Sequence, residues 1–183
     1  MKKHISAAPS QHLELRVHAL AQLFNSLDPT PFLNKDLDRE AEAFIENWAM
    51  LHSHKSRLHI TVHLATIPEE AEPGTLVAAA IHNYFDYKAH RVRGELSLLL
   101  RQGRASLVIG LVFVTLCLLA ADAVGQPGSG TAGTIARESL TIVGWVAMWR
   151  PLQILLYDWW PLVRRIRIYK ALKASQVRVV YQA

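Results

Sequence analysis

The sequence predicts an α/β membrane protein, in which a small cytoplasmic α/β domain (two to three strands with helices) is combined with a two-helix transmembrane hairpin. Three observations predict this class. A run without charged side chains extends from Ala105 to Ala121, and at 1.5 Å per residue it is about 26 Å long, close to the thickness of a bilayer core. A second apolar run extends from about Glu138 to Trp160. Before the first run, segments of period two alternate with segments of helical period.

The N-terminal elements are predicted from this alternation. Two segments in which apolar and polar residues alternate are typical of half-buried strands, and two segments of helical spacing lie between them. A strand is therefore expected over 12–18, a short helix over 20–27, a helix over 38–51 and a strand over 57–64. Glu42 and Glu46 belong to the solvated face of the second helix, and its apolar stripe consists of Ala41, Phe44, Ile45, Trp48 and Leu51. A crossover through helices implies that the two strands are parallel.

A long helix is expected from about Thr75 into the first apolar run. Along it, apolar side chains recur at steps of three and four residues, which is the spacing of a coiled-coil seam. The seam consists of Phe85, Ala89, Val92, Leu96 and Leu99. Two interpretations stay open: an ordinary stripe that packs on the sheet, or a seam that joins the protomers of a homo-oligomer.

The inner end of the second apolar run is also open to two interpretations, because Arg150 and Pro151 interrupt it. In the first, a kinked helix continues to Trp160 and Arg150 lies inside the membrane, where Asp158 is a candidate partner. In the second, the span ends at Arg150 and an interfacial helix follows. The expected interfacial anchors are Trp149, Trp159 and Trp160.

Charge sets the expected orientation. Lysines and arginines flank both outer ends of the hairpin, whereas only Asp122, Arg137 and Glu138 are charged between the runs. Since basic flanks stay on the cytoplasmic side, both termini should be cytoplasmic and the Gly-rich loop external. The net charge is +5. The surplus comes from the C-terminal tail, which favours contact with the anionic lipids of a bilayer and not with nucleic acid.

Three regions follow from these elements. The first, residues 1–104, is a cytoplasmic α/β domain that ends in the long helix. The second, residues 105–160, is the hairpin with an external Gly-rich loop at 125–137. The third, residues 161–183, is a basic cytoplasmic tail with a helix and then a strand-forming end. If this end adds an edge strand to the sheet, the hairpin is an insertion into one α/β domain.

One group of residues suggests a metal site. His82, Asp86 and His90 recur every four residues along the long helix, and such neighbours can share a metal ion. His82 and His90 are about 12 Å apart along the helix axis, so all three cannot bind one ion without a bend. The sequence has no GxSxG, GxxxxGK[ST] or HExxH motif. We therefore expect no enzymatic activity and no cofactor.

Two longer segments are informative as a whole: LAQLFNSLDPTPFLNKDLD (Leu20 to Asp38) and GWVAMWRPLQILLYDWWPL (Gly144 to Leu162). They resemble a family of uncharacterised bacterial inner-membrane proteins with a cytoplasmic N-terminal domain and two C-terminal transmembrane spans. The resemblance covers most of the chain. It implies a bacterial inner membrane, and it carries over no activity, ligand or site residues.

The sequence thus predicts a non-enzymatic, homo-oligomeric inner-membrane protein that acts as a scaffold or partner-binding subunit, with a protein partner at the cytoplasmic domain. Two alternatives stay open. One is a small oligomeric channel or ion-handling protein, in which Arg150 and Asp158 line a path. The other is a metal-responsive membrane protein that uses the histidines of the long helix.

Overall fold

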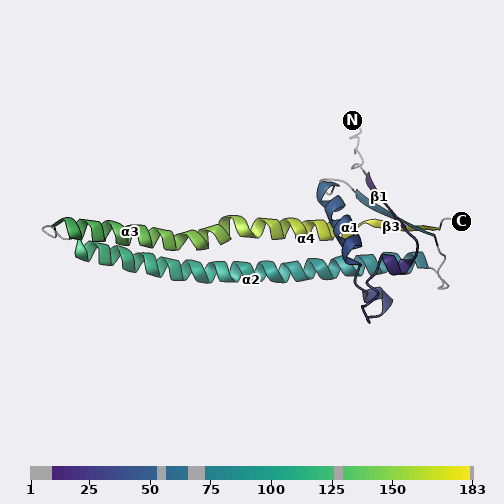
Figure 1. Cartoon of the computed structure of the whole chain (residues 1–183), viewed down its shortest axis with the longest axis horizontal. Coiled ribbons are helices and arrows are strands. Elements are labelled where there is room, and N and C mark those ends of the chain that lie inside the picture. The colour runs from purple at the N-terminus through teal and green to yellow at the C-terminus, as the bar shows by residue number, and fades with distance from the viewer. Residues whose placement is uncertain (1–9, 53–56, 66–72, 126–129, 182–183) are drawn as a thin grey trace, which may run out of the picture. The chain divides into compact units, whose positions relative to one another are not determined.

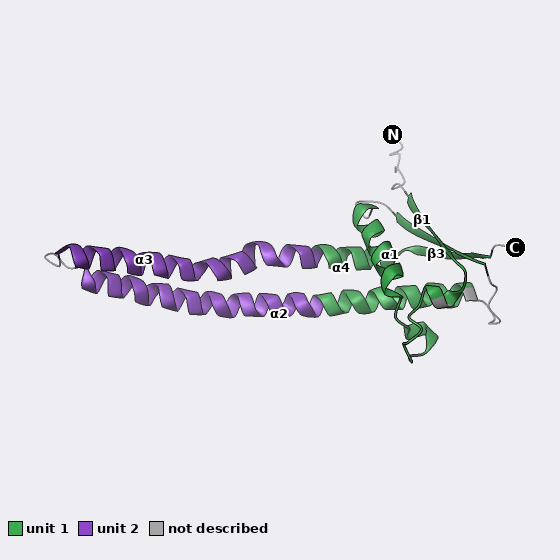
Figure 2. Cartoon of the chain, in the orientation of Figure 1, with its two compact units in different colours: residues 1–92, 164–183 green, residues 93–163 purple. Residues whose placement is uncertain are grey.

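The computed structural model describes residues 10–52, 57–65, 73–125 and 130–181. The chain is mostly helical, with one three-stranded sheet and two long apolar helices (Figure 1). It divides into two compact units, of which unit 1 comprises residues 1–92 and 164–183 and unit 2 comprises residues 93–163 (Figure 2). The helices are α1 (Arg39–His52), α2 (Pro73–Val124), α3 (Gly130–Gln153) and α4 (Trp159–Lys173), and the strands are β1 (Ser10–Val17), β2 (Arg57–Leu64) and β3 (Gln176–Tyr181).

The sheet of unit 1 is parallel, with the order β1-β2-β3. Leu13 pairs with Ile60 and Ile60 with Val177, so the predicted parallel pair and the predicted C-terminal edge strand are both confirmed. Residues 1–92 and 164–183 consequently share one sheet, and residues 93–163 are inserted between them.

All helices of unit 1 lie on one side of this sheet (Figure 1). Both crossovers step in the same direction, from β1 to β2 and from β2 to β3, and right-handed crossovers that step the same way place their helices on the same face. That face is apolar, and its buried side chains are Leu13, Leu15, Leu58, Ile60, Val62 and Leu64. The core of unit 1 lies between this face and helices α1, α2 and α4.

Two local predictions in unit 1 are wrong. Residues 20–27 form only a 3-10 turn, Leu20–Gln22, because the Asn25 side chain accepts a hydrogen bond from the Leu27 N–H and favours a turn. Helix α1 buries Ile45 and Ala49 but exposes Phe44 and Leu51, at 56% and 78%. The buried face of α1 is thus rotated from the predicted apolar stripe toward its glutamates.

Unit 2 is an antiparallel pair formed by α2 and α3, held close by glycines. A Cβ on Gly103 would lie 2.7 Å from Cγ2 of Ile154, and one on Gly144 would lie 3.0 Å from Cγ2 of Val114. A Cβ at Gly103 would force the Ile154 side chain to shift, and one at Gly144 would make an unusually tight contact, so glycine at both positions lets the two helices approach closely.

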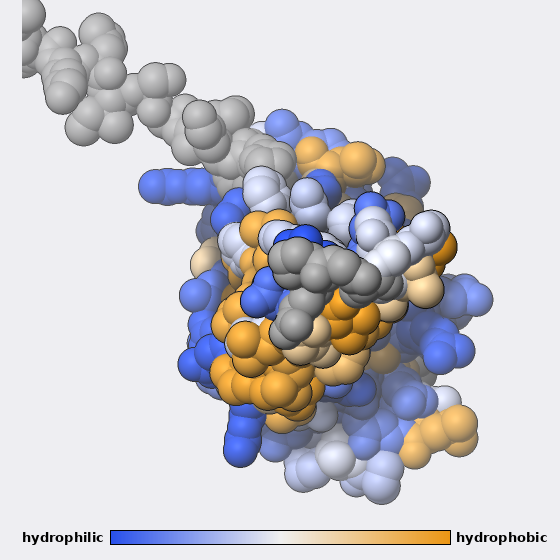
Figure 3. Space-filling model, turned by 90° about the vertical axis from the view of Figure 1, so that its left-hand side faces the viewer, coloured by the Kyte–Doolittle hydropathy of each residue, from blue (hydrophilic) through white to orange (hydrophobic). Residues whose placement is uncertain are grey.

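Both long helices are apolar and long enough to cross a membrane, and only 17% of the most apolar window of each is buried within the chain. The core helix of a soluble protein is instead mostly buried. Hydrophobic residues gather on part of the end of the helix pair that faces the viewer in Figure 3. The expected loop at 125–137 is shorter in the structure, because α3 already begins at Gly130. Residues 126–129 of that loop lie outside the described residues.

Candidate functional site

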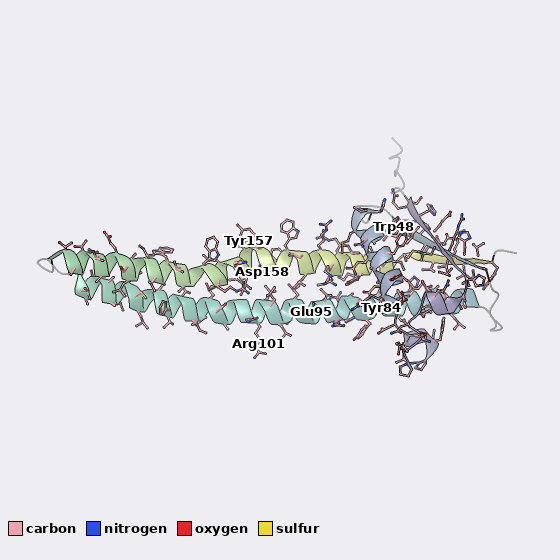
Figure 4. All side chains as sticks on the ribbon, viewed as in Figure 1. Trp48, Tyr84, Glu95, Arg101, Tyr157 and Asp158 are labelled. Atoms are coloured by element: carbon pink, nitrogen blue, oxygen red, sulfur yellow. The ribbon has the colours of Figure 1, made fainter. Side chains whose placement is uncertain are left out.

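Arg150 and Asp158 form an ion pair on unit 2, with 3.8 Å between Nη1 and Oδ2. The helical path continues through Pro151, since α3 ends at Gln153 and a π-helical turn, Ile154–Asp158, leads directly into α4. The inner end of the second run is therefore one helical path and not a break at Arg150. Figure 4 shows Asp158 on this π-turn and Arg101 on α2.

The π-turn explains how two residues eight positions apart come together. In a regular α-helix, eight residues rotate by about 800°, which leaves residue i+8 about 80° away from residue i. A π-turn accommodates one additional residue, so the rotation is about 700° and the two side chains are only about 20° apart. The pair of Arg150 and Asp158 thus depends on the π-turn, which the sequence reasoning missed.

A groove of about 640 Å³ lies next to this pair and is lined by Trp145, Val146, Trp149, Arg150 and Leu152. The two indole rings are exposed, at 66% and 72%. Large exposed aromatic surfaces beside a charged side chain are typical of contact with lipid headgroups or with a partner.

The two other predicted anchors, Trp159 and Trp160, follow the π-turn. Trp159 donates its indole N–H to the Leu155 carbonyl, 2.9 Å away. Trp160 is 66% exposed, and its ring centre is 6.2 Å from that of Trp159. The anchors therefore lie on both sides of the π-turn, with Trp149 before it.

The structure gives each predicted metal ligand a different role. His82 Nε2 lies 2.8 Å from the Ser175 carbonyl, and Asp86 pairs with Lys173 at 2.9 Å. His90 is exposed and contacts Asp86 of its own helix. Within the described residues, no group of three or more His, Cys, Asp or Glu side chains could hold one metal ion. Asp86 thus joins α2 to the end of α4, and His82 joins α2 to the turn between α4 and β3.

The predicted seam divides between the two units. Phe85, Ala89 and Val92 are almost fully buried in unit 1, and the ring of Phe85 stacks on that of Tyr169 in α4, 6.1 Å away. These three side chains therefore contact residues of their own chain. Leu96 and Leu99 are half-buried in unit 2.

Two carboxylates of α1 bind α2 and α4 in the same way. Glu42 accepts a hydrogen bond from the Tyr84 hydroxyl at 2.7 Å and pairs with Lys88 at 2.6 Å. Glu46 accepts one from the Tyr169 hydroxyl at 3.1 Å and pairs with Arg165 at 3.6 Å. The predicted solvated face is wrong for these two glutamates, whose side chains are 18% and 14% exposed. We call the two groups the tyrosine clamps.

The pKa values of the clamp tyrosines reflect this environment. Burial raises the pKa of Tyr84, and its hydrogen bond to the Glu42 carboxylate raises it further. Burial likewise raises the pKa of Tyr169, although the neighbouring Arg165 opposes the effect. Both tyrosines therefore stay neutral, and their hydroxyl groups donate hydrogen bonds to the glutamates, which keeps α1 bound to both helices.

The second face of the sheet is polar, and we call it the open face. It carries three arginines, one carboxylate and three histidines: Arg16, Arg57, Arg178, Glu14, His12, His59 and His63. The rings of His12 and His59 stack, with 4.7 Å between their centres. Nε2 of His63 is buried without a hydrogen-bond partner among the described residues, and Glu14 is 3.9 Å away. The alternation in the sequence predicted the polar side chains, but not that no helix within the described residues would cover this face.

A parallel sheet with one bare face is unusual. Parallel sheets are generally covered by helices on both faces. In this sheet, the described helices all lie on the apolar side, and the crossovers never reverse direction. Since ligand crevices of open α/β sheets form where the strand order reverses, the topology gives no such crevice. On the open face, His12, Glu14 and Arg16 of β1 and Arg178 of β3 are exposed, whereas His59, Thr61 and His63 of β2 are half-buried.

No protein-family model matches the sequence, and no curated protein or solved structure is significantly similar to it.

Proposed function

We propose that the protein is a non-enzymatic subunit of the bacterial inner membrane, anchored by the transmembrane hairpin, which binds a partner protein through the open face of its cytoplasmic domain. The observation that carries this proposal is the bare, basic face of a parallel sheet. The exposed apolar surface of α2 and α3 supports the membrane anchor.

The orientation in this proposal rests on charge. Basic residues precede Ala105 and follow Trp160, whereas few charges lie between, and basic flanks stay in the cytoplasm. Unit 1 contains the basic flank that follows Trp160, whereas Arg93, Arg101 and Arg104 of the flank before Ala105 belong to unit 2. The resemblance to inner-membrane proteins with a cytoplasmic N-terminal domain supports the same placement.

The charge of the open face favours an acidic segment as the partner's contact. The open face carries three arginines and only one glutamate, distributed over the three strands. Two copies of this surface would repel each other, since like charges across an interface are unfavourable. An acidic peptide segment would instead be attracted and would gain hydrogen bonds from the guanidinium groups. The open face is accordingly proposed for a different protein and not for a second copy.

Topology is tested with single cysteines in a Cys117→Ser background. Thr131→Cys lies at the start of α3 and Ala174→Cys at the end of α4, and both positions are exposed. A membrane-impermeant maleimide applied to spheroplasts is expected to label position 131 at once and position 174 only after lysis. Labelling of position 174 in intact spheroplasts would overturn the orientation.

Partner binding is tested by photo-crosslinking in the native host. A benzoylphenylalanine at Gln176 on the open face is compared with one at Asn47, an exposed position of α1. We expect an adduct only from Gln176, to a different protein, through a peptide of net negative charge. Arg16→Glu with Arg178→Glu should abolish the adduct, whereas Arg167→Glu on α4 should leave it. An adduct to a second copy of this chain, or no adduct, would contradict the proposal.

A further inference from the structure

The charge-free stretch of α3 is much shorter than that of α2. Between Glu138 and Arg150 it extends over about 17 Å, compared with about 26 Å for Ala105 to Ala121 on α2. Both charge-free stretches are shorter than the hydrocarbon core of about 30 Å, but only the stretch of α3 falls short of it by more than a third. A lipid beside α3 must therefore place its polar headgroup deeper, or the bilayer must thin there.

The depth of Arg150 follows from the contacts within unit 2. A Cβ on Gly110 would contact Met148 and Pro151, at 3.0 and 3.4 Å, so Arg150 is level with Gly110. Gly110 lies about 9 Å beyond Arg104, the last charged residue before the apolar run of α2. An exposed arginine at this depth is costly unless it extends toward the interface or meets an anion.

The neighbours of Arg150 match the order of groups in a phospholipid. On the deeper side lies the apolar groove with Trp145 and Trp149, which suits an acyl chain. Arg150 itself suits a phosphate. Asp158 lies eight residues further toward the cytoplasm. Its carboxylate suits a cationic group of the headgroup, which lies farther from the bilayer centre than the phosphate.

The ion pair also leaves both groups able to bind a ligand. Its 3.8 Å separation exceeds the roughly 2.8 Å of a charge-assisted hydrogen bond, and a guanidinium has several further donors. A purely anionic headgroup would be repelled by Asp158. A headgroup that carries an ammonium would satisfy the carboxylate as well as the guanidinium.

We propose that the groove beside Arg150 binds one phospholipid with a primary-ammonium headgroup, its phosphate on Arg150, its ammonium on Asp158 and an acyl chain along Trp145 and Trp149. This site rests on the proposed membrane anchor. It makes the π-turn part of a lipid site, because only the π-turn brings Asp158 onto the face of Arg150.

The test is quenching of tryptophan fluorescence by brominated phospholipids in vesicles that contain the full chain with Trp48→Phe. The vesicles are phosphatidylcholine with brominated phosphatidylethanolamine, phosphatidylglycerol or phosphatidylcholine. We expect phosphatidylethanolamine to bind about fivefold more tightly than the other two, the strength typical of one partly exposed ion pair. Arg150→Gln should abolish the preference. Asp158→Asn should convert it to a preference for phosphatidylglycerol.

Arg101→Gln is the matched control, because Arg101 is an exposed arginine of α2 in the same unit (Figure 4), and it should leave the preference unchanged. Circular dichroism confirms that each variant is folded. Equal quenching by all three lipids would overturn the site, and a preference for phosphatidylglycerol in the unchanged chain would overturn the ammonium assignment. Absence of quenching by any lipid would instead contradict the membrane anchor itself.

Discussion

At the residue scale, the tyrosine clamps show how a few polar contacts hold three helices together. Glu42 and Glu46 are one helical turn apart, and each receives a hydroxyl and a cation from a different helix. Lys88 and Arg165 also lie over the rings of their own tyrosines, at 5.4 and 5.7 Å. The sequence could not predict this arrangement, because a glutamate on an amphipathic helix looks solvated until its partners on other helices are known.

The first residue-scale prediction concerns alkaline pH. Because burial raises the pKa of Tyr84 above the ordinary tyrosine value of 10.0, the clamp contributes stability that is fully present below pH 10 and is lost as pH rises further. Thermal melts by circular dichroism between pH 8 and 11 should show this loss. Tyr84→Phe should flatten the alkaline decline, whereas Tyr87→Phe, at an exposed tyrosine, should not. An equally steep decline in both variants would contradict the clamp.

The second residue-scale prediction compares two glycines of α2. Gly103→Ala places a Cβ 2.7 Å from Cγ2 of Ile154 and should destabilise the helix pair by about 1–3 kcal/mol, the usual cost of overpacking. A Cβ on Gly94 has nothing within 4 Å. Gly94→Ala should therefore stabilise the chain by up to about 1 kcal/mol through helix propensity. Thermal unfolding in detergent measures both, and the same sign for both would contradict the packing of unit 2.

At the element scale, hydrophobic period predicted which segments form helices and strands but not the phase of every helix. Of the stripe predicted for α1, Ile45 is buried, but Phe44 and Leu51 are exposed, and Ala49, which was not part of the stripe, is buried. The π-turn could not be predicted from the sequence for a different reason. Its position depends on the packing contacts of the helix before and after it, because the additional residue keeps both segments facing their partners.

The element-scale prediction follows from the additional residue in the π-turn. Deletion of Leu156, an exposed π-turn residue, should convert the turn into regular α-helix and leave the residues after it in register. Deletion of Ala147 within α3 should rotate everything after it by about 100°. We expect native-like melting in detergent for the first deletion and loss of a cooperative transition for the second. Equal damage from both would contradict a register role for the π-turn.

At the scale of the whole molecule, the sequence predicted the apolar helix pair and the strand at the chain end, because both depend on local composition. It did not predict which surfaces the fold would leave bare. That outcome depends on the direction of two crossovers and on the rotation of α1, which are properties of the assembled chain. Among the described residues of unit 1, such surfaces include the polar open face and the exposed side chains of Phe44 and Leu51 on α1, with the half-buried Trp48 between them.

The last prediction concerns the expected homo-oligomer. Three of the five seam residues are buried within the chain, so they are not available to a second copy. The α1 stripe is available, since Phe44 and Leu51 are exposed and one side of the helix can form a self-complementary apolar contact with its symmetry mate. We therefore expect Phe44→Glu with Leu51→Glu to dissociate the oligomer in native mass spectra of lipid-extracted protein.

The variant should keep its melting temperature, because neither side chain contributes to the core. Leu27→Glu, at a loop leucine that is 88% exposed, is the matched control and should leave the subunit number unchanged. An oligomer that survives the double substitution would show that the copies associate elsewhere, and a monomer in the unchanged chain would contradict the homo-oligomer expected from the sequence.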